Sequence, residues 1–142
     1  MTDITKLPIR RAAEDNPAVG DFIHEGFSKY GLRNDVTLNY DAFCFAAEDN
    51  GKIAGVITGR AYYNEVHIGD LIVDRRCRRS GLGKRLVGAV EEAYRGRGYD
   101  VITLTTFGFQ APEFYRKLGY TIEFVRENKD PKLCKYFLKK EL

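Results

Sequence analysis

The sequence predicts an α/β domain built on a mixed β-sheet, and three observations lead to that fold class. Runs rich in β-branched and aromatic residues alternate with segments whose apolar residues recur at helical spacing. Single glycines, asparagines and prolines separate these segments, without a linker, an internal repeat or a low-complexity tract. The chain has 142 residues, a length that suits one hydrophobic core. We therefore expect a single domain over residues 1–142.

The first half of the chain predicts a strand, a helix and three further strands. Asp15 or Asn16 can cap the helix, because Pro17 follows at a position that favours a helix start. The pair Asn50-Gly51 is typical of a tight turn between two strands. In chain order we expect a strand at 4–13, a helix from 17 to about 31, a loop or short helix at 32–41, and strands at 43–47, 52–63 and 65–73.

The second half predicts a long amphipathic helix, a strand, a short helix and a terminal pair of strands. Leu82, Leu86, Val90 and Tyr94 recur every four residues and form one apolar stripe. The expected elements are a helix from 82 to glycine 96 or 98, a strand at 101–106, a helix opened by proline 112 and closed by glycine 119, and strands at 120–125 and 133–138. The complete order, β-α-β-β-β-α-β-α-β-β, favours an α/β domain with a mixed sheet.

Composition and charge exclude several classes of protein. The net charge is only +3, too weak to indicate a nucleic-acid partner, and no apolar run approaches the ~20 residues that span a bilayer. The N-terminal sequence lacks the apolar centre of a secretory signal. Three cysteines without a CxxC spacing indicate free thiols in a reducing cytoplasm, and the two histidines form no cluster with metal-ligand spacing. We expect a cytoplasmic protein without a metal, a nucleic-acid partner or a membrane partner.

The segment CRRSGLGKRL, at residues 77–86, lies between a predicted strand and the long helix. Free N–H groups and the dipole at a helix start favour an anion, and Gly81 and Gly83 allow the backbone to approach a phosphate closely. The flanking cations also fit solvated side chains at a helix start, but the two glycines favour phosphate binding. A P-loop would need Gly at position 78 and Ser or Thr at 85, and a dinucleotide fingerprint would need Gly at 86. The chain has two arginines and a leucine at these positions, so neither motif fits.

What fits the segment is the pattern [RQ]-x-x-G-x-[GA], at Arg78, Gly81 and Gly83. Further along, APEFYRKLGY at residues 111–120 matches A-x-x-x-Y-x-x-x-G-[FY]. With these motifs and this order of elements, nearly the whole chain resembles the GNAT (Gcn5-related N-acetyltransferase) superfamily, and in particular its small, single-domain bacterial members. The resemblance implies an α/β (α+β) fold with a mostly antiparallel central sheet, flanked by helices, and a turn that binds the pyrophosphate of acetyl-CoA. The cofactor-binding residues that it implies are Leu71, Ile72, Val73, Arg78, Arg79, Ser80, Gly81, Leu82, Gly83, Lys84, Gln110, Phe114 and Tyr115.

The resemblance also implies a reaction, in which a primary amine attacks the thioester of acetyl-CoA directly. Tyr115 would protonate the departing thiolate, because in the family this hydroxyl lies near the cofactor sulfur. The alternative is a core aromatic residue of a short helix. A backbone N–H of the strand at residues 71–73 would stabilise the oxyanion, as the family implies.

The amine needs a base, because an alkyl ammonium is almost fully protonated at pH 7. His67 is the first candidate: it precedes Arg78 by eleven residues, the spacing at which some relatives carry a catalytic histidine. Its ordinary pKa near ~6.5 suits proton transfer at neutral pH. It also fits a half-buried strand histidine with a structural hydrogen bond, and Glu65 is the second candidate. Simple alternation puts His67 and Leu71 on one face of their strand and Asp70 on the other, unless a bulge redirects it.

The acceptor site is implied less specifically than the cofactor site. The family builds it from the first helical region and from loops near the fourth and last strands, where aromatic residues suggest a lining for a small-molecule amine. These aromatic residues also fit ordinary loops; they are Tyr30, Tyr40, Tyr62 and Phe109. Two other functions stay open, a non-catalytic acyl-CoA sensor and an acetyltransferase of protein or peptide amines, and so does a homodimer.

One position departs from the family pattern. Many relatives carry an asparagine seven residues before the tyrosine, where it contacts the pantetheine arm of the cofactor. This chain has Gly108 there. Gln110 or Thr106 could supply the lost polar contact.

Overall fold

The computed structural model describes residues 3–142 and divides them into two compact units, one ending at Leu38 and one spanning Asn39–Leu142. The first unit holds a 3-10 helix, η1 (Ile4–Lys6), and the helix α1 (Pro17–Arg33). The side chain of Asn16 accepts a hydrogen bond from the N–H of Ala18 at 3.0 Å, so the predicted helix start is confirmed. In the described part of the chain, no helix is both long and apolar enough to cross a membrane.

The strand expected at 4–13 is wrong. Ile4–Lys6 forms the 3-10 helix, and the following residues up to 13 have no regular structure. A β segment is stabilised by pairing and by side chains on a neighbouring strand, and the ladder of this protein is built entirely from residues 41–141. Residues 7–13 also carry Pro8, Arg10 and Arg11, which offer little apolar surface to a sheet.

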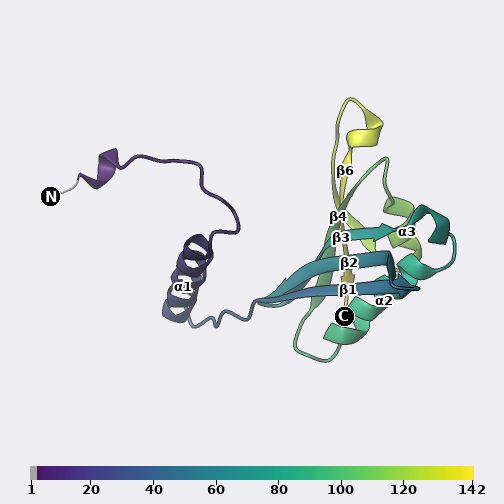
Figure 1. Cartoon of the computed structure of the whole chain (residues 1–142), viewed down its shortest axis with the longest axis horizontal. Coiled ribbons are helices and arrows are strands. Elements are labelled where there is room, and N and C mark those ends of the chain that lie inside the picture. The colour runs from purple at the N-terminus through teal and green to yellow at the C-terminus, as the bar shows by residue number, and fades with distance from the viewer. Residues whose placement is uncertain (1–2) are drawn as a thin grey trace. The chain divides into compact units, whose positions relative to one another are not determined.

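The second unit contains a six-stranded sheet with the order β1-β2-β3-β4-β6-β5 (Figure 1). Every pairing is antiparallel except that of β3 with β4. This confirms the mixed, mostly antiparallel sheet, and from β1 onward it follows the predicted order. The elements are β1 (Asp41–Asp49), β2 (Lys52–Tyr62), β3 (Glu65–Val73), η2 (Arg75–Cys77), α2 (Leu82–Tyr94), β4 (Val101–Phe107), α3 (Pro112–Lys117), β5 (Thr121–Arg126), η3 (Pro131–Leu133) and β6 (Lys135–Glu141).

The core of this unit lies between α2 and one face of the sheet (Figure 1). Helix α2 buries Leu86, Val87 and Val90 from its apolar stripe. The strands contribute fully buried branched side chains such as Ile57 and Ile102. Because this face is apolar and packed, the opposite face of the sheet is left for polar side chains.

Strand β3 contains a β-bulge that changes which side chains share a face. Gly69 has no partner in β2, because Ile68 pairs with Gly59 and Asp70 pairs with Thr58. Gly59 tolerates this arrangement because it has no side chain: a Cβ there would lie 2.1 Å from the carbonyl oxygen of His67. After the bulge, the alternation of inward and outward side chains is offset by one residue.

The predicted placement of His67 and Leu71 on one face is therefore wrong. Leu71 and Val73 pack against the hydrophobic core, whereas His67 lies on the opposite face. Asp70 joins His67 on that polar face, opposite Thr58 of the neighbouring strand.

Candidate active site

Two strands diverge at the centre of the sheet and open a cleft between them. The parallel pairing of β3 with β4 covers only Glu65–Val101, Val66–Ile102 and His67–Thr103. Beyond these pairs β3 continues to Val73 and β4 to Phe107, each bonded only to its other neighbour. The backbone groups along the open edges are available to a ligand, because a strand edge presents unpaired N–H and C=O groups.

The divergence contains two hollows that adjoin each other. The outer cleft, of about 690 Å³, is lined by the end of β3, by the glycine turn and by the segment leading into α3. The inner cavity, of about 550 Å³, lies deeper between β3 and β4 and reaches Tyr115. Both hollows are lined by Leu71, Ile72, Gln110 and Ala111. An extended ligand can therefore lie along both hollows, from the glycine turn to Tyr115.

The glycine turn is shaped by its caps and by two left-handed residues. The side chain of Asp74 accepts a hydrogen bond from the N–H of Arg76 at 3.0 Å, which starts η2. Arg79 has a φ of 62° and Gly81 a φ of 83°. A left-handed conformation carries no steric cost for glycine, which explains Gly81 at the position before α2. The hydroxyl of Ser80 donates to the carbonyl of Cys77 and closes the turn.

The start of α2 offers free N–H groups to an anion. Gly81 provides no side-chain cap, and the first helical bond runs from the N–H of Arg85 to the carbonyl of Gly81 at 3.1 Å. The N–H groups that precede this bond have no intrahelical partner, and the helix dipole is positive at this end. The cations that line the same cleft are Arg78, Arg79 and Lys84. The arrangement is chemically suited to a phosphate or pyrophosphate.

Gly83 has a packing role that the sequence did not suggest. A Cβ at this position would lie 3.2 Å from the ring of Phe114, closer than nearly all such contacts. The absence of a side chain therefore brings the first turn of α2 against α3. Gly81, by contrast, has open space around the position of a Cβ. Glycine is favoured at position 81 by the left-handed backbone conformation there and not by packing.

Tyr115 lies on α3 and lines the inner cavity. The residue is only 6% exposed, and this burial raises the pKa of its hydroxyl to about 12. No side chain of residues 3–142 makes a hydrogen bond to that hydroxyl. A neutral phenol without a protein partner can donate its proton to a ligand in the cavity.

His67 and Glu65 belong to a polar network one step back along β3. The ring Nδ1 of His67 lies 2.9 Å from the hydroxyl of Thr103, which itself donates to the carboxylate of Glu65. The hydroxyl of Tyr62 also reaches that carboxylate, at 3.4 Å. Burial and the nearby guanidinium of Arg60 lower the pKa of His67, so its ring is neutral at pH 7.

The structure does not bring this network into the inner cavity. Neither His67 nor Glu65 is among the residues that line it, because the two strands are still paired at His67. Asp70 does line the cavity, together with Tyr115, and its carboxylate lies 3.3 Å from the hydroxyl of Thr58. The sequence analysis placed Asp70 on the face away from His67. Gly69 was the one sign to the contrary, since a glycine within a strand can mark a bulge.

The departure at Gly108 has a steric cause. A Cβ there would lie 2.3 Å from the carbonyl oxygen of Pro131, so the backbone leaves no room for an asparagine side chain. Thr106 and Gln110 both line the inner cavity. The side-chain oxygen of Gln110 accepts a hydrogen bond from the N–H of Phe107 at 2.9 Å, which fixes the side chain at the mouth of the cavity.

Three of the four aromatic residues predicted for the acceptor site belong to the second unit, and they lie on different elements of it. Phe109 lines the outer cleft, and Tyr62 ends β2 beside Glu65. Tyr40 is 56% exposed and precedes β1, and Tyr30 belongs to the first unit. Neither hollow is lined by a tyrosine of this set.

The cysteines and potential metal ligands show no further site. Cys44, Cys77 and Cys134 are free thiols. Within residues 3–142, no group of histidine, cysteine, aspartate and glutamate side chains could hold a metal ion.

Comparisons with known proteins agree with this fold. The model of the acetyltransferase (GNAT) family matches residues 10–120. The blasticidin-S acetyltransferase of Streptomyces morookaense is 32% identical over 99 residues, which cover 69% of this chain and 73% of that protein. A crystal structure of an acetyltransferase from Bacillus cereus is 29% identical, with a TM-score of 0.75 over 94% of this chain and 98% of the other.

A third protein is similar to this chain in fold, at a lower sequence identity. The structure of an aminoglycoside 6'-N-acetyltransferase complexed with coenzyme A is 20% identical, with a TM-score of 0.62, and covers 95% of this chain and 97% of the other. All three proteins are acetyltransferases by name. The two structural matches extend over both units described above.

Proposed function

The chain belongs to the GNAT family of acetyltransferases and is a transferase enzyme, and from this premise we propose that it moves the acetyl group of acetyl-CoA to the primary amine of a small molecule. We further propose that residues 1–142 act as one acetyltransferase domain. The family match supports this, because it begins in the first unit and ends in the second. The observation that carries the proposal is the continuity of the outer cleft with the inner cavity.

Acetyl-CoA would lie along this path with its pyrophosphate at the glycine turn. The free N–H groups at the start of α2 and the side chains of Arg79 and Lys84 provide positive potential there. The pantetheine arm is a chain of amides, and the open edges of β3 and β4 offer it backbone partners. The acetyl group would then reach the inner cavity, beside Tyr115.

Tyr115 would act as the general acid that protonates the departing thiolate. Its hydroxyl has no competing hydrogen bond, and its raised pKa keeps the proton in place until the carbon–sulfur bond breaks. An N–H along the open edge of β3 near Ile72 would stabilise the oxyanion.

Two groups could take the proton from the incoming ammonium. His67 is neutral at pH 7 and, hydrogen-bonded by Thr103, has a fixed ring orientation. Asp70 is favoured by one specific observation, since it lines the cavity with Tyr115 and His67 does not. In our proposal Asp70 attracts the cationic amine, and His67 or Glu65 receives the proton through water.

A small-molecule acceptor fits the dimensions and the chemistry of the inner cavity. Apart from Asp70, its polar side chains are those of three threonines, Gln110 and Tyr115, all of them neutral. One carboxylate among neutral groups suits a single cationic amine. The name of the Streptomyces morookaense relative, an acetyltransferase of blasticidin S, supports a small molecule as the acceptor.

The test is a turnover assay with acetyl-CoA and a panel of small amines, peptides and protein amines. Release of the coenzyme A thiol, with acetylated small amine identified by mass, supports the proposal. Acetylation confined to peptide or protein amines would replace the small-molecule acceptor with a macromolecular one. Tight binding of acetyl-CoA without turnover of any amine would indicate a sensor and overturn the proposal.

A further inference from the structure

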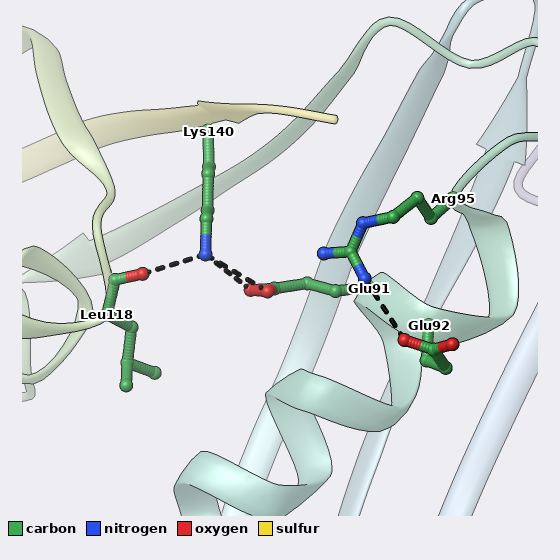
Figure 2. Close-up of polar contacts among 5 residues, drawn as sticks. All are labelled: Glu91, Glu92, Arg95, Leu118 and Lys140. Atoms are coloured by element: carbon green, nitrogen blue, oxygen red, sulfur yellow. Dashed lines mark hydrogen bonds and ion pairs between the residues drawn. The ribbon is translucent and has the colours of Figure 1, made fainter.

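A partly buried ion pair connects the helix of the glycine turn to the helix of Tyr115 (Figure 2). Glu91 lies on α2, nine residues after the first residue of that helix, and its side chain is only 11% exposed. Lys140 extends from β6, and its Nζ donates to both carboxylate oxygens of Glu91, at 3.0 and 3.1 Å. The same Nζ donates to the carbonyl oxygen of Leu118 at 2.9 Å.

Leu118 caps the C-terminal end of α3, and the backbone there follows the Schellman arrangement. The N–H of Gly119 bonds to the carbonyl of Arg116 at 3.0 Å, and the N–H of Tyr120 bonds to the carbonyl of Tyr115 at 3.1 Å. Gly119 has the left-handed φ, 95°, that this motif requires. The motif leaves the carbonyl of Leu118 without a backbone partner, and Lys140 supplies one.

The lysine also touches the residues that hold the ring of Tyr115. Tyr120 packs edge-on against Tyr115, with ring centroids 5.8 Å apart, and Lys140 Nζ lies 5.6 Å from the centroid of the Tyr120 ring. A Cβ on Gly119 would come within 3.5 Å of the Lys140 side chain. The Lys140 side chain therefore contacts three consecutive residues after α3: the Leu118 carbonyl, Gly119 and the Tyr120 ring.

Helix α3 is short, and besides Lys140 it is held by the packing of Phe114, Tyr115 and Leu118 on the core. The N–H of Ala111, just before the helix, also donates to the hydroxyl of Thr106. The helix spans only Pro112–Lys117, and its first residue is preceded by Ala111, which provides no side-chain cap. Within residues 3–142 the hydroxyl of Tyr115 makes no hydrogen bond, so its place depends on the helix and on ring packing.

We propose that Lys140 is a positioning residue for the acetyl-transfer reaction. By joining Glu91 on α2 to the end of α3, it fixes the Tyr115 hydroxyl relative to the turn at the start of α2. The inference rests on the role proposed above for Tyr115 as the general acid. A displacement of about 1 Å at a reacting group can cost roughly 10²-fold in rate, so a loosened α3 should reduce turnover strongly.

The experiment separates positioning from stability with a double variant. Lys140→Met alone leaves the Glu91 carboxylate buried and unpaired, which destabilises a protein whatever its mechanism. Glu91→Met/Lys140→Met replaces the pair with apolar side chains of similar length and should recover the melting temperature. It cannot recover the hydrogen bond to Leu118. We therefore expect kcat to stay about 10²-fold below that of the parent while the KM for acetyl-CoA changes little.

The matched control is the neighbouring ion pair on the same helix. Arg95 donates to Glu92 at 3.0 Å on the exposed side of α2, also drawn in Figure 2, and contacts nothing in α3. Arg95→Met should leave kcat, KM and the melting temperature at the values of the parent. Recovery of kcat together with the melting temperature in the double methionine variant would overturn the proposal.

A second readout does not depend on turnover. With tyrosine labelled at the ring carbon that bears the hydroxyl, NMR follows the ionisation of Tyr115, assigned by its loss in Tyr115→Phe. In the parent the signal should remain that of a neutral phenol up to pH 10.5, because its pKa is about 12. In the double variant, water reaches the loosened ring, and the signal should begin to titrate below pH 10.5. If the parent turns over no amine, the proposed function fails. The NMR titration then tests by itself whether Lys140 positions Tyr115. An unchanged titration in the double variant would refute that role of Lys140.

Discussion

Replacing Tyr115 with phenylalanine removes one hydroxyl and keeps the ring that packs against Phe114 and Tyr120. In the part of the chain that the structure describes, the hydroxyl makes no hydrogen bond, so its loss leaves no partner there unsatisfied. We therefore expect the melting temperature and the affinity for acetyl-CoA to be preserved. Only the step that uses the phenolic proton should change.

The size of the change follows from the raised pKa of the Tyr115 hydroxyl. That pKa is about 12, against ~8.5 for a thiol, a difference of ~3.5 pKa units. Complete proton transfer to a finished thiolate would thus be uphill by ~5 kcal/mol. The proton must therefore move while the carbon–sulfur bond is breaking, which is concerted general-acid catalysis. Its loss should lower kcat by roughly 10²–10⁴-fold.

The assay is thiol release at saturating acetyl-CoA and amine, between pH 6.5 and pH 10. A phenol with a pKa of about 12 is only ~1% ionised at pH 10, so the kcat of the parent should not fall on the alkaline side. A decline centred near pH 10 would show an ordinary, solvated phenol. Tyr99→Phe is the control, because it removes a tyrosine hydroxyl from a residue that packs on the core and lines neither hollow. A Tyr115→Phe variant with the kcat of the parent would refute the general-acid role.

Three further expectations concern the turn, the base and the departure from the family pattern. Arg79→Glu/Lys84→Glu should weaken acetyl-CoA binding by about 10²-fold or more in calorimetry, with the loss shrinking at high salt, because two attractive charges become repulsive; an unchanged Kd would remove the pyrophosphate from this turn. The acidic limb of kcat/KM should lie below pH 6.5, because the lowered pKa keeps His67 neutral into more acidic solution. His67→Gln should abolish this limb, whereas Asp70→Asn should raise the KM of the amine; a limb unaffected by His67→Gln would exclude this histidine as the base. Gly108→Asn should destabilise the fold by roughly 1–3 kcal/mol or more, since its Cβ would meet the Pro131 carbonyl, and a melting temperature equal to that of the parent would contradict this.

The local signals in the sequence predicted most of the elements correctly. Pro17 after Asn16, the pair Asn50-Gly51 and Gly119 each report a backbone constraint that acts within a few residues, and the corresponding helix start, hairpin and helix end are where the sequence puts them. Ile4, Leu7 and Ile9 suggested a strand at 4–13, but a strand also needs a partner. Pairing is a property of the whole sheet, so the sequence of this segment could not decide it.

In the candidate site, too, the sequence predicted features formed by neighbouring residues and missed a contact between residues far apart in the chain. The glycine turn is a local motif, and the structure brings its cations to the same cleft as Phe114. The joining of Lys140 to Glu91 spans 49 residues and left no local pattern. One sign was available: Glu91 falls on the buried side of α2, between Val87 and Tyr94, where an unpaired carboxylate would be costly.

The bulge at Gly69 is an insertion that the hydrophobic core does not require. If Gly69 were deleted, Ile68 could still pair with Gly59 and Asp70 with Thr58, and every other side chain of β3 would keep its present face. The sheet would become more regular, because no residue would be left without a partner. What would be lost is the extra peptide unit in the lining of the inner cavity, where Gly69 lies. Deletion of this one residue would thus keep the hydrophobic core and change only the shape of the inner cavity. Such a variant would show separately what folding requires and what the cavity requires.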